Sequence, residues 1–183
     1  MKQRSIFTWI AAMGMILAAA FSNSTASAQV PGAIISAGAL GGYQSTSRAD
    51  MGSGDYYSIR GSFTSLFAEL RHTDWGNASN GIHENGLLAG ADISLLHIMF
   101  SGAVGIGSCK YQAASVGGSE TGPELIPPPV SYNSLIYEAQ AMYQFDIVAG
   151  MITAGIGVNY TAESNNTAPI SGWGGVASVS VGL

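Results

Sequence analysis

Residues 66–75 read LFAELRHTDW, and the side chains of this stretch alternate between two kinds. Over residues 66–73, one set is apolar except for its last member, and it consists of Leu66, Ala68, Leu70 and His72. The other set holds the charges, and it consists of Phe67, Glu69, Arg71 and Thr73. Because successive side chains of a β-strand point to opposite faces, the pattern predicts a strand with one apolar face and one polar face.

The same period of two returns along most of the chain. It predicts strands over 33–43, 57–63, 66–75, 86–95, 98–111, 134–145, 148–160 and 173–183. Most are near the roughly 9–11 residues that a tilted membrane-spanning strand needs. In a membrane barrel, alternate side chains face the lipid and the lumen. We therefore predict an all-β fold, an eight-stranded antiparallel up-and-down transmembrane β-barrel.

The connections between these strands alternate in length. Long polar loops are expected at 44–55, 76–85, 112–132 and 161–170, and short turns at 63–66, 95–97 and 145–147. Long loops outside and short turns inside are typical of the bacterial outer membrane. Aromatic residues near the strand ends favour interfacial girdles over plain β-propensity: Tyr43, Tyr56, Tyr57, Trp75, Tyr111, Tyr132, Tyr143, Phe145, Tyr160 and Trp173.

Composition excludes several classes of protein. Only 9% of the 183 residues are charged, against about 25% in soluble domains. Six Lys and Arg residues are too few for a nucleic-acid binder. A single cysteine excludes a disulfide framework and a Cys-rich zinc module. We therefore expect no cofactor, no metal site and no nucleic-acid partner.

The first 28 residues have the pattern of a secretory signal peptide. Lys2 and Arg4 precede an uncharged apolar run over 6–21, and Ala26-Ser27-Ala28 forms a cleavage site before Gln29. The alternative is a membrane anchor, but the run is shorter than the roughly 20 residues that a spanning helix needs. The expected organisation is a cleaved segment 1–28, exported by the Sec route, and a barrel domain 29–183.

Two stretches resemble the small eight-stranded outer-membrane barrels of the OmpA/OmpX type. Residues 67–76 look like the third strand of that family, and residues 101–107 look like its glycine-rich middle strands. The resemblance implies a monomer in the outer membrane, in contact with lipid and lipopolysaccharide. It also implies an aromatic last residue, where this chain has Leu183.

Most of the strand charges fall on the set that faces the lumen: Arg60, Glu69, Arg71, Asp92 and Glu138. An arginine on the lipid face at the bilayer midplane costs about 2–4 kcal/mol, and an eight-stranded lumen is just wide enough for side chains to fill. We predict a structural salt-bridge cluster in the lumen. The alternative is a narrow gated channel or proton path.

An enzyme acting on membrane lipid is a further alternative. Barrels resembling the lipid A deacylases use a His-x-Ser-Asn motif, whereas His72 is followed by Thr73, Asp74 and Trp75. We therefore expect no catalytic residue. The histidines His72, His83 and His97 are expected at opposite ends of the barrel, which argues against a metal site. Cys109 is expected to be a small buried lumen residue.

Six further acidic residues are assigned to the extracellular loops: Asp50, Asp55, Glu84, Glu120, Glu124 and Glu163. Loops held by a rigid scaffold are the usual place for partner binding. The sequence thus favours a structural or surface-interaction protein that presents four extracellular loops, and adhesion, host-factor binding and phage reception all fit that role.

Overall fold

A computed structural model describes residues 35–48, 50–77, 80–113, 127–149, 151–164 and 169–182. The predicted signal peptide, Glu120, Glu124 and Leu183 lie outside these residues. No helix within the described ranges is long and apolar enough to cross a membrane. The strands are β1 (Ile35–Thr46), β2 (Ser53–Phe63), β3 (Leu66–Asn77), β4 (Asn80–Leu95), β5 (Ile98–Gln112), β6 (Val130–Val148), β7 (Ile152–Ser164) and β8 (Ile170–Gly182).

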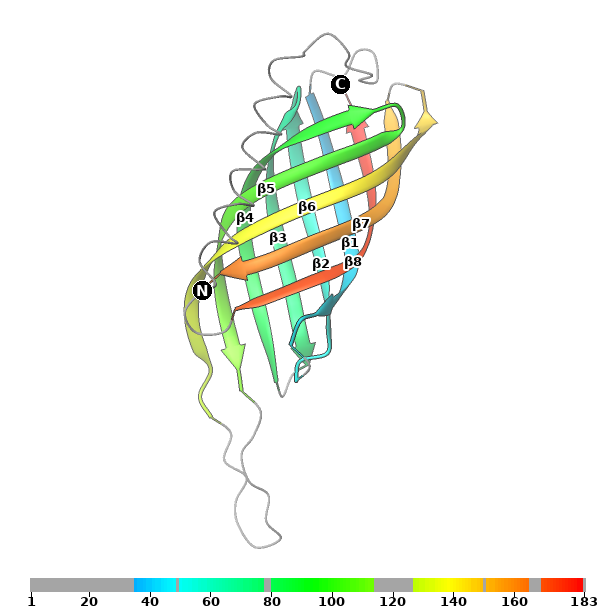
Figure 1. Cartoon of the computed structure of the whole chain (residues 1–183). Helices are drawn as coiled ribbons and strands as arrows, with labels where there is room; N and C mark the ends of the chain where they lie inside the picture. Colours follow the sequence, from blue (N-terminus) through cyan, green and yellow to red (C-terminus); the bar gives the residue numbers. More distant parts are fainter. Residues whose placement is uncertain are drawn as a thin grey trace, which may run out of the picture.

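The eight strands form one closed barrel in sequence order, and every neighbouring pair is antiparallel (Figure 1). The barrel closes where β1 pairs with β8, from Ser36 opposite Gly182 to Thr46 opposite Gly172. Closure leaves no strand with an unpaired edge, which is what a sheet needs in order to exist in lipid. The predicted fold class is confirmed.

Four connections lie at one end of the barrel, which we call the loop end, and three lie at the turn end. The predicted loop over 76–85 is wrong, because β3 continues to Asn77 and β4 begins at Asn80. Gly76, with a φ of 85°, and the Asn77 side chain, which accepts a hydrogen bond from the Asn80 amide at 2.9 Å, help form a tight hairpin instead. The predicted turn at 145–147 lies later, because β6 bulges between Asp146 and Val148 before it ends.

The outward side chains change from apolar to polar between two adjacent rows of the ladder. Leu70, Leu87, Ile106 and Leu135 form one row across β3–β6. The next outward row toward the loop end is His72, Asn85, Ser108 and Asn133. A lipid-facing surface excludes polar groups. The apolar belt therefore ends between these two rows, and the part of β3–β6 on the loop-end side of this boundary extends beyond the belt.

Inward side chains fill the lumen in three apolar clusters. The cluster nearest the loop end is Met51, Trp75, Ile82, Cys109 and Ile170. The middle cluster is Phe67, Leu88, Ala103 and Ile136, and the third is Leu40, Tyr56, Met99, Met142 and Val176. Leu40 lies inward although its strand is mostly Gly and Ala, because β1 keeps the phase set by Gln44. The positions predicted for Trp75 and Tyr56 in the girdles are therefore wrong, and so are those predicted for Tyr111 and Tyr132, which pack against the cluster nearest the loop end.

Crowding in the lumen requires glycine where two backbones approach closely. A Cβ on Gly174 would overlap the Tyr43 carbonyl oxygen and lie 2.7 Å from Gln44 Cα, whereas a Cβ on Gly175 would meet nothing within 4 Å. We predict that Gly174→Ala lowers the free energy of unfolding by about 1–3 kcal/mol, measured by urea unfolding in lipid vesicles. Gly175→Ala is the matched control, and equal losses in the two variants would contradict the argument.

Candidate functional site

The buried charges of the lumen are organised by Arg60 on β2. Its Nε donates to Glu69 Oε2 at 2.7 Å, and Nη1 reaches Asp92 at 3.4 Å. Its Nη2 reaches Glu138 Oε1 at 3.3 Å and donates to Gln140 Oε1 at 3.1 Å. With Ser101 Oγ at 3.3 Å from Nη1, one guanidinium thus joins five side chains from the four strands β3–β6, and its planar fork of five donors suits that task.

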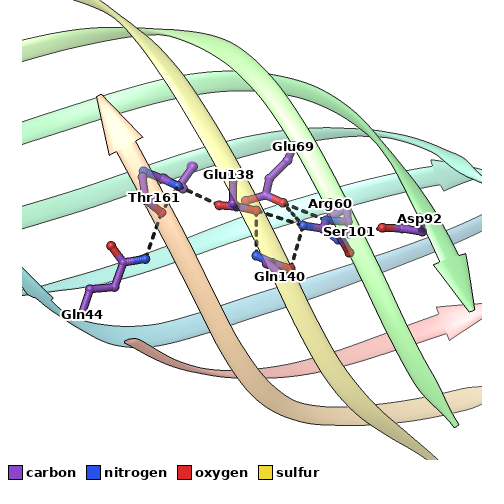
Figure 2. Close-up of polar contacts among 9 residues, drawn as sticks. Gln44, Arg60, Glu69, Asp92, Ser101, Glu138, Gln140 and Thr161 are labelled. Carbon is purple, nitrogen blue, oxygen red and sulfur yellow. Dashed lines mark hydrogen bonds and ion pairs between the residues drawn. The ribbon is translucent and has the colours of Figure 1, made fainter. Parts of the chain in front are cut away.

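Arg71 on β3 forms the second centre and is fully buried. Its Nη1 donates to Glu138 Oε2 at 2.7 Å and to Thr161 Oγ1 at 3.1 Å. Its Nη2 reaches Glu84 Oε1 at 3.3 Å. Because Glu138 accepts from both arginines through different oxygens, it links the two centres into one network (Figure 2).

The structure brings together all five residues that the sequence assigned to the lumen. Asp92 is the most exposed of the five, with 16% of its side chain accessible near the turn end. The network also contains residues that sequence reasoning missed: Gln44, Glu84, Ser101 and Thr161. Ser101 and Thr161 accept from arginine, and Gln44 donates to Thr161 at 3.0 Å.

Glu84 and Glu163 were expected in loops, and that expectation is wrong because both are buried in the lumen. Glu84 is in phase with Leu88, and Glu163 is in phase with Asn159 and Thr161. The period of two, continued past the point where polar residues begin, is the signal that would have found them. The polarity of the surrounding sequence did not distinguish a loop from a strand whose inward face lines a polar lumen.

The outside of the barrel carries the complementary surface. Large apolar side chains stand exposed around it, among them Ile59 at 68%, Leu70 at 64% and Ile106 at 64%. Monomeric soluble proteins rarely expose an apolar band of this extent. Tyr57 and Trp173 are exposed near the loop end, and Tyr143 and Phe145 near the turn end, as girdle residues are expected to be.

The histidines lie at the two ends as the sequence predicts. His72 and His83 both contact Asp74 near the loop end, at 3.2 and 2.5 Å. His97 lies in the β4–β5 turn at the turn end, with its ring centroid 5.8 Å from that of Tyr143. The three rings therefore do not converge on one metal ion.

The first loop carries an ion pair outside the apolar belt. Arg48 Nη2 donates to Asp50 Oδ2 at 2.6 Å, and this hydrogen bond lowers the pKa of the Asp50 carboxyl. The Asn80 side chain donates to the Asp50 carbonyl oxygen at 2.9 Å, which ties the first loop to the β3–β4 hairpin. The described loops thus present polar groups of both signs.

No family model and no curated protein sequence matches this chain. Solved structures do match in fold. Neisserial surface protein A is 16% identical with a TM-score of 0.53, over 81% of this chain and 97% of that chain. Ail, the attachment invasion locus protein of Yersinia pestis, is 13% identical with a TM-score of 0.53, over 81% of this chain and 99% of that chain.

A second structure of Ail, in complex with the heparin analogue sucrose octasulfate, is 15% identical with a TM-score of 0.51, over 80% of this chain and 97% of that chain. These neighbours are small eight-stranded outer-membrane barrels of the OmpA/OmpX type. The predicted resemblance is thereby confirmed at the level of fold.

Glu138 provides the sharpest test of the lumen network. Removing its charge leaves two buried guanidiniums without their shared partner, and breaking a buried ion pair in this way costs about 3–5 kcal/mol. We predict that Glu138→Gln lowers the free energy of unfolding by that amount, measured by urea unfolding in lipid vesicles.

Asp146→Asn is the control on the same strand. Asp146 is exposed and accepts one hydrogen bond, from Thr153 Oγ1 at 3.2 Å, so its loss should stay within about 0.5 kcal/mol. If Glu138→Gln is as stable as the wild type, the two arginines do not depend on Glu138.

Proposed function

We propose that this chain is a non-enzymatic barrel of the bacterial outer membrane, whose sealed body holds its loops at the cell surface for structural or surface-interaction roles. The supporting observation is the contrast between its two faces: an apolar outside and a lumen in which charged groups bond to one another. A soluble barrel would need the opposite arrangement on its outside. Residues 1–28 are proposed to direct export by the Sec route and to be removed.

The lumen does not favour ion conduction as the main role. Both guanidiniums bond to carboxylates across the interior, and Ile82, Leu88 and Ile136 are fully buried in it. An ion crossing the barrel would have to break the contacts of Glu138 with both arginines. The network therefore acts as a plug that makes the barrel rigid.

An enzymatic role has no support in the described residues near His72. Its ring contacts Asn85 at 2.8 Å and Asp74 at 3.2 Å on the outward face, and no serine is among those contacts. Thr73, the next residue, points into the lumen and is fully buried. A nucleophile and a base that act on lipid would have to share one accessible face.

The loops are the proposed interaction surface, and their chemistry differs from that of a polyanion receptor. Ail has been crystallised with a sulfated heparin analogue. Here the described loop-end surface offers Arg48 and Lys110 beside Asp50, Asp55 and Asp74, and it has no cluster of basic side chains. A sulfated polysaccharide is thus not the partner that we propose.

Cell fractionation with heat-dependent gel mobility tests the proposal. We expect the protein in the outer-membrane fraction. Its mass should match that of a chain that begins at Gln29. We also expect a change of mobility on SDS gels after boiling, because a closed barrel resists detergent until heat opens it. Recovery from the periplasm without a mobility change would contradict the membrane assignment.

A further inference from the structure

Two carboxylates and the only thiol of the chain meet inside the barrel near the loop end. Cys109 Sγ on β5 lies 3.9 Å from Glu84 Oε2 on β4 and 3.9 Å from Glu163 Oε2 on β7. One ligand atom from each of these residues lies within 4.8 Å of the others, and all three residues are buried. Glu84 and Cys109 lie directly opposite one another on β4 and β5, and the curvature of the closed barrel brings Glu163 from β7 to them.

Each carboxylate is held by its other oxygen. Glu84 Oε1 contacts Arg71 Nη2 at 3.3 Å, and Glu163 Oε1 accepts from Trp75 Nε1 at 2.7 Å. The second oxygen of each is thereby directed at the sulfur, which also contacts Ser134 Oγ at 3.2 Å. Such outer contacts are what orients ligands around a metal ion in proteins.

The lumen around the cluster holds more carboxyl groups than basic groups, which favours the binding of a cation. The described part of the lumen holds two guanidiniums, Arg60 and Arg71, against five carboxyl groups: Glu69, Glu84, Asp92, Glu138 and Glu163. Arg60 forms salt bridges with Glu69, Asp92 and Glu138. Arg71 forms salt bridges with Glu138 and Glu84. No salt bridge joins Glu163 to an arginine or lysine among the described residues.

A buried hydroxyl next to the cluster is an independent observation. Thr73 is fully buried, lies directly opposite Glu84 in the β3–β4 register, and shares its lumen face. Its Oγ1 has no hydrogen-bond partner among the described residues. Cross-strand neighbours have Cβ atoms about 4.5–5.5 Å apart, so this oxygen lies within reach of an ion held by Glu84.

We propose that Glu84, Cys109 and Glu163 form a binding site for a thiophilic divalent cation of the Zn²⁺ class, with Thr73 beside its fourth position. Zinc takes thiolate sulfur at about 2.3 Å and carboxylate oxygen at about 2.1 Å in a tetrahedron, which places sulfur and oxygen about 3.6 Å apart. The observed 3.9 Å is close to that spacing. The thiolate selects zinc or cadmium over magnesium and calcium, and binding releases the thiol proton.

Cadmium is the probe of choice, because a cadmium–thiolate bond has its own ultraviolet charge-transfer band. The full chain is folded in detergent micelles with and without CdCl₂, since the cluster is closed off from solvent. We expect one cadmium ion per folded chain, with the thiolate band. Cys109→Ser should abolish the band, and Glu163→Gln should weaken binding at least about tenfold.

Asp92→Asn is the matched control, because it removes a lumen carboxyl near the turn end and should leave cadmium binding unchanged. Each variant is first checked for folding by the β-sheet signal of its circular dichroism spectrum. If Glu163→Gln does not fold, the test becomes the temperature at which that signal is lost, which Zn²⁺ should raise in the wild type and not in Cys109→Ser.

Two results would overturn the proposal. A folded wild-type chain that takes up no cadmium would assign the cluster to carboxyl groups that share protons. A thiolate band that Glu163→Gln and Glu84→Gln leave unchanged would show metal bound to the lone thiol outside this site. Neither result depends on membrane location, so the site and the proposed function fail separately.

Discussion

Closure of the sheet is the constraint on which the rest of the structure depends. Lipid offers no hydrogen bonds to a strand edge, and only a ladder that returns to its first strand leaves no edge in the membrane. Here β1 and β8 complete that ladder along Ser36–Thr46. The apolar outside, the crowded lumen and the glycine positions all follow from a sheet that closes after eight strands.

Closure after eight strands also fixes how wide the lumen is, and therefore what can fill it. Apolar clusters occupy part of the interior, and Arg60 and Arg71 occupy the rest with their carboxylates. The Arg60 guanidinium lies over the aromatic ring of Phe67, and its Cζ atom is 3.8 Å from the ring centroid. Charged side chains lie inside and apolar side chains outside, which is the reverse of a soluble domain. Because the outer surface needs no charges to stay in water, only 9% of the residues are charged.

The inward or outward direction of most side chains could be predicted from the sequence, because successive residues of a strand point to opposite faces. Glu69 and Arg71 were assigned to the lumen because they share one phase and because a charged side chain is costly in lipid, and they lie there. Trp75 and Tyr56 were assigned to the girdles by residue type, against their phase, and both are buried inward. For the aromatic residues, phase was the reliable signal and residue type was not.

The meeting of Glu84, Cys109 and Glu163 could not be predicted in the same way. Phase places each of them inward, but which inward residues face one another depends on the stagger between strands, and that stagger is a property of the closed barrel. Glu163 and Cys109 are 54 residues apart and lie on β7 and β5, which are not paired. Only the assembled register brings them within reach of one ion.

The two faces of the barrel wall meet different surroundings, lipid on the outside and a filled polar interior on the inside. Trp173 is 64% exposed on the outside, and Trp75 is 1% exposed in the lumen. The direct measurement is fluorescence quenching by brominated lipids, in folded chains where one of these tryptophans remains and the others are phenylalanine. We expect strong quenching of Trp173 and little quenching of Trp75, and equal quenching of both would contradict the assignment of the two faces.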